Sequence, residues 1–533
     1  MRATSIQLAT FASTVSLVLG LPLLAHAETY RVGTSDTADY RQLDELPALE
    51  PGDLVLIEGS TDYDGGVVFD SDWDGTTAMP IVIRGLVADG GTRPRISGGM
   101  NTIELQGDHY VLENLDITGG SRRCVFHHAH DITIRDSVVH DCPAQGILGA
   151  DNDSGSLTLE RVEVHHAGGG TFDHQIYMAT DEVAYPGSVF RMIGCWVHDA
   201  NGGNSVKSRA ERNEIFFNWI EGGYYHELEL IGPDPSGGID EDQAREDSDV
   251  VGNVFVKRGM NENFAVVRFG GDGTGQSLGR YRFAFNTVIV APGATAAIFR
   301  LFSGLESVEM HSNVFAMRGG GSPNLLREVE AEWVRGRLVA GTNNWVPTGS
   351  TNVPPEWTGT ITGSDPGLVD LGALATIDAR PATMTSPVVD VGLAPPPAFT
   401  ASPFTSPREL IDQSPVHGVG TTPRPLVGTI DLGAYEHGTA PPPSDAGLTP
   451  DAAVFADDAF VPPGVDGAVL PVDAAVPPGV DGGRADAAGS NVDAGAGASS
   501  AGCGCRASTR EGRGAMVITL GLGLAVSLRR RRR

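Results

Sequence analysis

Short runs of β-branched and aromatic residues recur along the middle of the chain, separated by Gly, Asn and Asp, as in "HYVLENLDITGG" and "GSLTLERVEVHHAGG". Such runs predict short strands joined by turns. One apolar position recurs about every 22 to 36 residues, a spacing typical of stacked-repeat folds. The equivalent residues are Ile117, Val139, Val164, Val197, Ile220, Val256, Ile289 and Phe315. The pattern predicts an all-β fold, a right-handed single-stranded parallel β-helix with about three short strands per coil.

Asparagine recurs beside the apolar strand that ends each of four consecutive coils, at Asn218, Asn253, Asn286 and Asn313. Side-chain amides that stack from coil to coil can hydrogen-bond to one another and so satisfy buried polar groups. We therefore expect an asparagine ladder inside the solenoid. Histidine recurs in the same way, in "VVHD", "EVHH" and "WVHD". Stacked imidazoles at these positions either bind Zn²⁺ or pack as like residues do in repeat proteins. The three histidines are His140, His165 and His198.

The stretch "NSVKSRA" predicts where its cations point. Successive side chains of a strand face opposite sides, so an inward Val206 places Lys207 and Arg209 on the outer surface. Neighbouring coils align in the same way, about 4.8 Å apart. The predicted outer strip carries Tyr177, Lys207, Arg209, Glu227, Glu229 and Arg268. This strip is either a charged groove for a ligand or a ladder that pairs charges on an exposed sheet.

Charge and cysteine content narrow the function classes. The 533 residues carry a formal net charge of −30, so the chain lacks the broad basic footprint of a nucleic-acid-binding protein. Two of the five cysteines lie near the C-terminus. Among Cys124, Cys142 and Cys195 at most one pair can form, and the sequence leaves the pairing open.

The N-terminus has the features of a secretory signal peptide. Met1 to Ala27 combines a charged start, an apolar run and the small-residue site Ala25-His26-Ala27. We expect cleavage after Ala27 and export of the mature chain. Near the other end, residues 439–501 are rich in Ala, Pro, Asp and Gly, which predicts a disordered, extended linker.

Residues 502–533 combine "GCGCR", a short apolar run and a terminal Arg cluster. This order resembles the MYXO-CTERM sorting tail of myxobacterial surface proteins. The resemblance implies anchoring at the outer cell surface, with Cys503 or Cys505 as the processing site. The apolar run of about 14 residues is short for a transmembrane helix, which needs about 20. A plain membrane tail is the alternative.

The stretches "LEPGDLVLIEGSTDYDGG" and "GTTAMPIVIRG" resemble the opening coils of pectate-lyase-like β-helix proteins. This resemblance covers residues 28–320 and implies the pectin-lyase-like solenoid, a fold that hosts lyases, hydrolases, epimerases and binding proteins. Residues 321–438 contain "TSPVVDVG" and "RPLVGTIDLGAYEHG", which resemble the closing segment of bacterial surface β-helix proteins. The strand "KSRA" followed by "HELEL" resembles a group of lyase-like β-helix proteins, from which His226-Glu227 departs.

The leading hypothesis is a polysaccharide lyase that cleaves an acidic, uronate-containing polysaccharide by β-elimination. This reaction needs cations to neutralise the substrate carboxylate and a base to remove the adjacent proton. Lys207 is the candidate base, and Tyr177 and His174 are candidate proton donors. The candidates for holding the carboxylate and the rest of the substrate are Arg209, Arg212, Arg268, Glu227 and Glu229.

Three alternatives stay open. The acidic insertion that contains Asp240 and Asp242 could, with Glu229, bind Ca²⁺, or it is a solvated loop. Glu227 and Glu229 are separated by about 6.6–7 Å along a strand, a spacing compatible with an inverting glycoside hydrolase. A non-catalytic glycan-binding or adhesive protein is the third possibility. In each case we expect a secreted, surface-anchored monomer whose partner is a polysaccharide.

Overall fold

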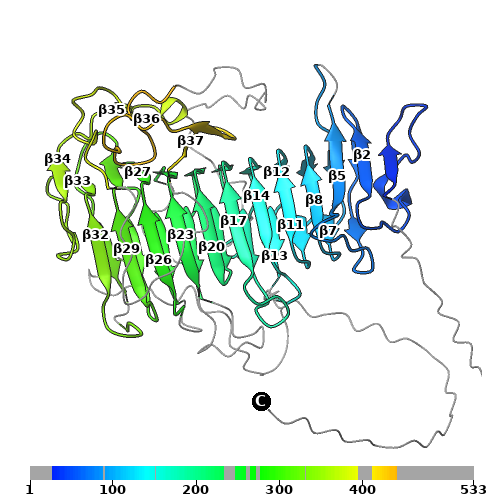
Figure 1. Ribbon diagram of the computed structural model, residues 1–533, viewed down its shortest axis with the longest axis horizontal. Coiled ribbons are helices and arrows are strands. Elements are labelled where there is room, and N and C mark those ends of the chain that lie inside the picture. The colour runs from blue at the N-terminus through cyan, green and yellow to red at the C-terminus, as the bar shows by residue number, and fades with distance from the viewer. Residues whose placement is uncertain are drawn as a thin grey trace, which may run out of the picture. The chain divides into compact units, whose positions relative to one another are not determined.

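The computed structural model describes residues 27–440 except for 88–89, 151, 233–245, 260–263, 272–276, 330–331 and 394–410. These residues form short strands and turns, with two brief 3-10 helices, η1 (Leu43–Glu45) and η3 (Leu374–Thr376) (Figure 1). No helix in these ranges is long and apolar enough to cross a membrane. The predicted signal peptide apart from Ala27, most of the predicted linker and the predicted sorting tail lie outside the described residues.

Three long parallel sheets make up the solenoid, and the coils between its two ends each contribute one strand to each sheet, which confirms the predicted parallel β-helix. Sheet A has twelve strands: β1 (Thr29–Val32), β2 (Leu54–Glu58), β5 (Ile81–Leu86), β8 (Tyr110–Glu113), β11 (Ile132–Arg135), β14 (Leu157–Glu160), β17 (Val189–Ile193), β20 (Arg212–Phe216), β23 (Asp247–Val251), β26 (Arg280–Ala284), β29 (Ser307–His311) and β32 (Val339–Thr342). Its strands lie side by side along the solenoid in Figure 1.

The other two sheets follow the same progression. Sheet B has twelve strands: β3 (Asp62–Asp64), β6 (Arg95–Ser97), β9 (Asp116–Thr118), β12 (Val138–His140), β15 (Glu163–His165), β18 (Trp196–His198), β21 (Trp219–Glu221), β24 (Val254–Lys257), β27 (Thr287–Val290), β30 (Val314–Met317), β33 (Trp345–Pro347) and β34 (Ile361–Gly363). Sheet C has ten: β4 (Val67–Phe69), β7 (Asn101–Leu105), β10 (Arg123–His127), β13 (Ile147–Gly149), β16 (Ile176–Ala179), β19 (Val206–Arg209), β22 (Leu228–Ile231), β25 (Val267–Gly270), β28 (Phe299–Leu301) and β31 (Leu326–Glu328).

The core consists of columns of apolar side chains, because register partners in successive coils carry residues of the same kind. In sheet C, Ile176, Val206, Leu228 and Val267 are register partners, and all four are fully buried. Full burial of one such side chain contributes about 1.5–3 kcal/mol. A single coil has no second layer to cover its inner face, so this stabilisation requires the stack.

The asparagine ladder is confirmed. The Nδ2 of Asn218 donates to Oδ1 of Asn253 (2.9 Å), Asn253 donates to Asn286 (2.9 Å), and Asn286 donates to Asn313 (3.3 Å). Asn344 adds a fifth rung that the repeat alignment did not include, at 2.9 Å from Asn313. Each asparagine thus satisfies polar groups that the solenoid would otherwise bury without partners.

Of the three cysteines in the solenoid, Cys124 and Cys142 form a disulfide with a Cα–Cα distance of 5.6 Å, and Cys195 is free and buried. Cys195 lies at the start of the asparagine ladder, where its backbone N–H donates to Oδ1 of Asn218 (2.8 Å). Burial raises the pKa of the Cys195 thiol to about 12, so this cysteine is an unreactive core residue.

The described residues after β34 form two antiparallel hairpins, β35 (Leu368–Asp370) with β36 (Asp378–Pro381), and β37 (Gln413–Pro415) with β38 (Thr421–Pro423). This segment packs against sheet B. One shared apolar cluster contains Trp219, Val254, Val256, Ile289, Ile377, Ala379, Ala434 and Tyr435. The outer face of sheet B is therefore partly covered by the chain itself, whereas the pocket described below lies on sheet C.

Candidate functional site

The candidate site is a pocket on sheet C, at strands β16, β19, β22 and β25. Its lining is formed by side chains from these strands and from the turns that precede them: Thr171, Phe172, His174, Asn204, Lys207, Tyr225, His226, Glu229, Phe264 and Arg268. Four of these residues were singled out from the sequence, namely His174, Lys207, Glu229 and Arg268.

One column of outward side chains forms the charged part of the pocket. Tyr177 pairs with Lys207, Lys207 with Glu229, and Glu229 with Arg268 in the parallel register. Val206 and Leu228, the residues before Lys207 and Glu229, are buried in the core, as the alternation predicted. The sequence therefore placed Tyr177, Lys207, Glu229 and Arg268 correctly along one strip.

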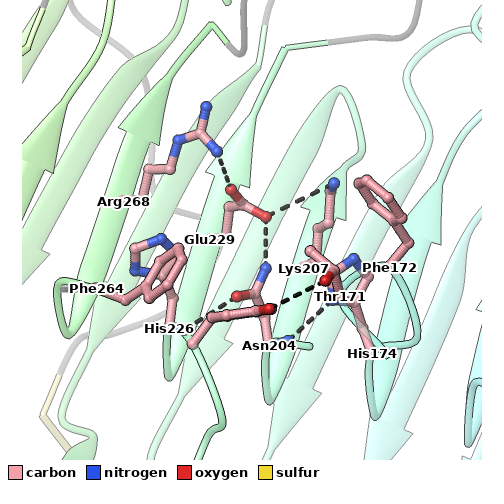
Figure 2. A pocket seen from close by; sticks show the side chains of 10 residues that line it. Thr171, Phe172, His174, Asn204, Lys207, His226, Glu229, Phe264 and Arg268 are labelled. Atoms are coloured by element: carbon pink, nitrogen blue, oxygen red, sulfur yellow. Dashed lines mark hydrogen bonds and ion pairs between the residues drawn. The ribbon is translucent and has the colours of Figure 1, made fainter. Parts of the chain in front are cut away.

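The Glu229 carboxylate is the centre of this column. It accepts a hydrogen bond from Arg268 at Oε1 and one from Asn204 Nδ2 at Oε2 (2.6 Å). The Lys207 ammonium lies 3.7 Å from Oε2. Figure 2 shows the carboxylate between Arg268 and Lys207, with Asn204 joined to it. Burial opposes ionisation of Glu229, but Lys207 and Arg268 outweigh it and lower its pKa, so the group is a carboxylate at neutral pH.

Lys207 and Arg209 both contact Tyr177. The Lys207 ammonium lies 5.0 Å from the centre of the Tyr177 ring, and Arg209 Nε donates to the Tyr177 hydroxyl (3.0 Å). Arg209 Nη1 also donates to the carbonyl of Gly232 (2.7 Å). Arg209 therefore lies beside the pocket lining, and Tyr177 joins the two cations.

Asn204 organises the polar side of the pocket. Its backbone N–H donates to His174 Nδ1 (2.9 Å), its side-chain Oδ1 accepts from the backbone N–H of His226 (3.0 Å), and its Nδ2 holds Glu229. His174, Asn204 and His226 each lie two residues before an aligned core residue, namely Ile176, Val206 and Leu228. They therefore form a second column, one coil apart from one another.

Both histidines of this second column are neutral at physiological pH. Burial is the main reason why the pKa of His174 falls to about 3, and the nearby Lys207 acts in the same direction. Burial likewise lowers the pKa of His226 to about 3, against the opposing effect of Glu229. The pocket thus combines two cations, one carboxylate and two uncharged imidazoles.

Aromatic side chains form the walls of the pocket. The rings of Tyr225 and Phe264 have centroids 4.2 Å apart, and the Tyr225 hydroxyl lies 3.0 Å from the Thr171 hydroxyl. Phe172 is 53% exposed, which is unusual for a residue of its size and leaves its ring available to a ligand. Aromatic walls with a few polar groups between them are typical of small-molecule and sugar sites.

Two residues expected to bind the substrate, Arg212 and Glu227, lie outside the pocket lining. Arg212 belongs to β20 of sheet A, where its Nη2 contacts Asp249 Oδ2 at 2.5 Å, because the chain turns a corner between Arg209 and Arg212. Glu227 is fully buried and forms an ion pair with Lys257 (3.2 Å). Neither residue therefore lines the pocket.

Strand β22 begins at Leu228, directly after Glu227, so strand alternation does not determine where the Glu227 side chain points. The equivalent residues of neighbouring coils are also fully buried, namely Gln175, Ser205 and Val266. Burial raises the pKa of Glu227 to about 7, although Lys257 acts against this shift. Glu227 and Glu229 therefore do not form a pair of carboxyl groups around one substrate bond, as an inverting hydrolase requires.

The described pocket residues do not fit a Ca²⁺ ion. Calcium needs several oxygen ligands, whereas Glu229 is the one carboxylate of the described pocket lining, and it already accepts hydrogen bonds from Arg268 and Asn204 and forms an ion pair with Lys207. Across the described ranges, no cluster of three or more His, Cys, Asp or Glu residues is arranged to hold a metal. Asp240 and Asp242 lie outside the described residues.

The stack of His140, His165 and His198 is confirmed on sheet B, with ring centroids 4.9 and 5.0 Å apart. Carboxylates bind the outer two rings. His140 lies 2.8 Å from Asp116, and His198 lies 2.6 Å from Asp199. These contacts give the stack a packing and hydrogen-bonding role.

Asn204, His226 and the aromatic walls were not identified from the sequence. Asn204 and His226 precede their strands, where alternation gives no orientation. One signal was available, because aligning Ile176, Val206 and Leu228 also aligns His174, Asn204 and His226. A polar column beside a charged column was therefore visible in the repeat alignment.

Comparisons with known proteins give likenesses of fold. No family model and no curated protein matches the chain. The alginate lyase from Paenibacillus sp. str. FPU-7 has a TM-score of 0.37 and 12% identity, covering 63% of this chain and 99% of its own. The pectate lyase Pel9A has a TM-score of 0.45 and 12% identity, covering 77% of this chain and 96% of its own. The A-module of the Azotobacter vinelandii mannuronan C-5 epimerase AlgE6 has a TM-score of 0.35 and 11% identity, covering 58% of this chain and 90% of its own.

Proposed function

We propose that this protein is a polysaccharide lyase that cleaves a uronate-containing polysaccharide by β-elimination. The observation that carries the proposal is the pair of cations that lines the pocket. Lys207 and Arg268 flank the Glu229 carboxylate in one column, and all three side chains line the pocket. Cations placed in this way can bind a uronate carboxylate, and neutralising that carboxylate makes the adjacent C–H bond more acidic.

The surroundings of the column support a sugar ligand. Phe172, Tyr225 and Phe264 offer aromatic surfaces on which a sugar ring can stack, and Asn204 and the histidines offer hydrogen bonds. The pocket lies on the outer face of sheet C, where a polymer can extend over neighbouring coils. Glu227 is fully buried and pairs with Lys257, whereas Glu229 lines the pocket, so the two carboxyl groups cannot act together as the hydrolase alternative requires.

We also propose export and display at the cell surface. The Cys124–Cys142 disulfide supports export, because disulfides persist in oxidising compartments. The apolar N-terminal run, which ends in Ala25-His26-Ala27, supports secretion. The Cys-containing C-terminal tail supports anchoring. N-terminal sequencing of the exported protein tests the first of these points, and we expect Glu28 as the new N-terminus.

The activity is tested with the full-length protein on a panel of uronate polysaccharides, followed at about 235 nm, where a new C4=C5 double bond absorbs. We expect activity on at least one polymer and a loss of about 10²–10³-fold in kcat for Lys207→Met and Arg268→Met. Arg84→Met is the matched control, because it removes a cation from sheet A while Glu113 keeps Arg135.

Two other results would replace the proposal. New reducing ends without absorbance at 235 nm indicate a hydrolase. Binding to a uronate polymer without either product, lost in Lys207→Met, indicates a glycan-binding protein. Equal losses in Lys207→Met and Arg84→Met contradict the assignment of the pocket.

A further inference from the structure

The hydrogen bonds of the two pocket histidines fix their tautomers. His226 Nδ1 lies 2.7 Å from the carbonyl oxygen of Ala265, and a carbonyl oxygen can only accept. The proton of the neutral ring is therefore on Nδ1, and Nε2 keeps its lone pair. Among the described residues, His226 Nε2 has no hydrogen-bond partner, and the residue lines the pocket. His226 thus presents an uncharged proton acceptor.

His174 has the opposite tautomer. The backbone N–H of Asn204 donates to His174 Nδ1, so this atom carries the lone pair and the proton is on Nε2. His174 thus presents a donor to the same pocket. Asn204, one coil from each ring, sets the His174 tautomer through its backbone N–H and holds the backbone N–H of His226 with its side-chain Oδ1.

Lys207 does not have the environment of a base. Its ammonium group is attracted by the Glu229 carboxylate at 3.7 Å and by the Tyr177 ring at 5.0 Å, and both contacts favour the cation. Arg268 is likewise a cation held by Glu229. These two side chains suit the binding of a substrate carboxylate, which leaves the proton transfer to another group.

We propose that His226 is the catalytic proton-transfer residue and that it acts on one face of the sugar. This inference rests on the lyase activity proposed above. His226 Nε2 takes the proton from C5, and the electrons of the C5–H bond form the C4=C5 double bond. The C4–O4 bond breaks, and the imidazolium returns the proton to the departing O4, so His226 is neutral again. His174 Nε2–H donates to the substrate carboxylate as negative charge develops.

A single group that serves as base and then as acid selects a class of uronate. H5 and O4 must lie on the same face of the ring, which is the case when the carboxyl group and O4 are trans. This holds for β-D-mannuronate and D-glucuronate. In L-guluronate, the C5 epimer of mannuronate, and in D-galacturonate, H5 and O4 lie on opposite faces. We therefore infer a preference for mannuronate or glucuronate polymers.

The first test uses the unmodified full-length chain on poly-β-D-mannuronate and poly-α-L-guluronate, and on a D-glucuronate polymer against polygalacturonate. We expect initial rates at least ten-fold higher on the trans member of one pair. A preference for guluronate or galacturonate overturns proton return by one histidine. No cleavage of any polymer means that the proposed function itself fails, which is a different result.

The second test compares variants by kcat and KM on the preferred polymer. We expect His226→Gln to lose at least 100-fold in kcat with KM within about three-fold, and added imidazole to restore part of the rate of His226→Ala. His127→Gln is the matched control, since His127 is an equally buried neutral histidine on β10, outside the pocket. It should keep its kcat.

A merely structural role of His226 predicts a different pattern. His226→Gln and His127→Gln would then lose activity in proportion to their unfolded fractions, and imidazole would rescue neither protein. Near-normal kcat in folded His226→Gln would also overturn the assignment. Imidazole should not rescue Lys207→Met in any case, because the missing group there is a cation.

Discussion

Two columns of the solenoid carry the same order of charges, cation, carboxylate, cation, in three consecutive coils. On sheet A they are Arg84, Glu113 and Arg135; on sheet C they are Lys207, Glu229 and Arg268. The sheet A side chains are 41%, 11% and 36% exposed, against 13%, 3% and 3% on sheet C. The order of charges is shared, and the environment is not.

The environment decides what each column can do. Ion pairs in contact with water contribute about 0–1 kcal/mol, so the sheet A column is a weak structural ladder. Burial makes the sheet C charges strongly dependent on one another, and Asn204 and two neutral histidines surround them. A charged column on a β-helix is therefore a site candidate only where neighbouring residues enclose it.

The largest expected difference between the columns is in the stability that each loses when its central glutamate is replaced by glutamine. Glu229→Gln leaves Lys207 and Arg268 buried without their anion and should cost about 3–5 kcal/mol of unfolding free energy. Glu113→Gln should cost about 0–1 kcal/mol, since Arg84 and Arg135 can turn to water. Denaturant titration of both variants measures the difference. Equal costs would remove the distinction between the columns.

A smaller effect is expected in the pH dependence of stability. The folded-state pKa of His226 is about 3, below its ordinary value of 6.5, so the unfolded chain binds a proton that the folded chain does not. This stability is present above pH 6.5 and is lost as the pH falls. Between pH 6 and 5 the loss is about 1 kcal/mol for this one histidine.

The measurement is the unfolding free energy at pH 6 and at pH 5. His226→Gln should lose less stability than the unmodified chain over this interval. His127→Gln should show the same reduced slope, because its pKa is also lowered to about 3. Arg84→Met removes no histidine and should keep the full slope. An unchanged slope in His226→Gln would mean that this ring is protonated in the folded protein, contrary to its role as an acceptor.

The sequence was sufficient for the fold and for the charged column. Apolar positions and Asn218, Asn253, Asn286 and Asn313 recur once per coil, and strand alternation then orients Lys207 and Glu229. The charged column depends on residues within strands, where the backbone geometry is fixed. The asparagines lie in the turns between sheets A and B, and their recurrence once per coil was sufficient to identify them.

The errors and omissions fall where strands end. Arg212 lies past a corner that no Gly or Pro marks, since only Ala210 and Glu211 separate β19 from β20. Glu227 and His226 precede β22, where a bend sets the direction of each side chain. Backbone bends depend on contacts between coils, which one coil's sequence does not contain.

The smallest expected effect concerns salt. The Debye length falls from about 10 Å at 0.1 M to about 3 Å at 1 M salt, and screening acts mainly on charges in contact with water. The stability cost of Arg84→Met, at most a few tenths of a kcal/mol, should therefore vanish at 1 M NaCl. The stability cost of Lys207→Met should be the same at low salt and at 1 M NaCl, within experimental error, because its partner Glu229 is 3% exposed. An exposed uncharged substitution, Met100→Leu, corrects for the general effect of salt on folding. If 1 M NaCl reduced both costs in proportion, water would reach both columns alike, and enclosure could no longer explain why only one of them forms a site.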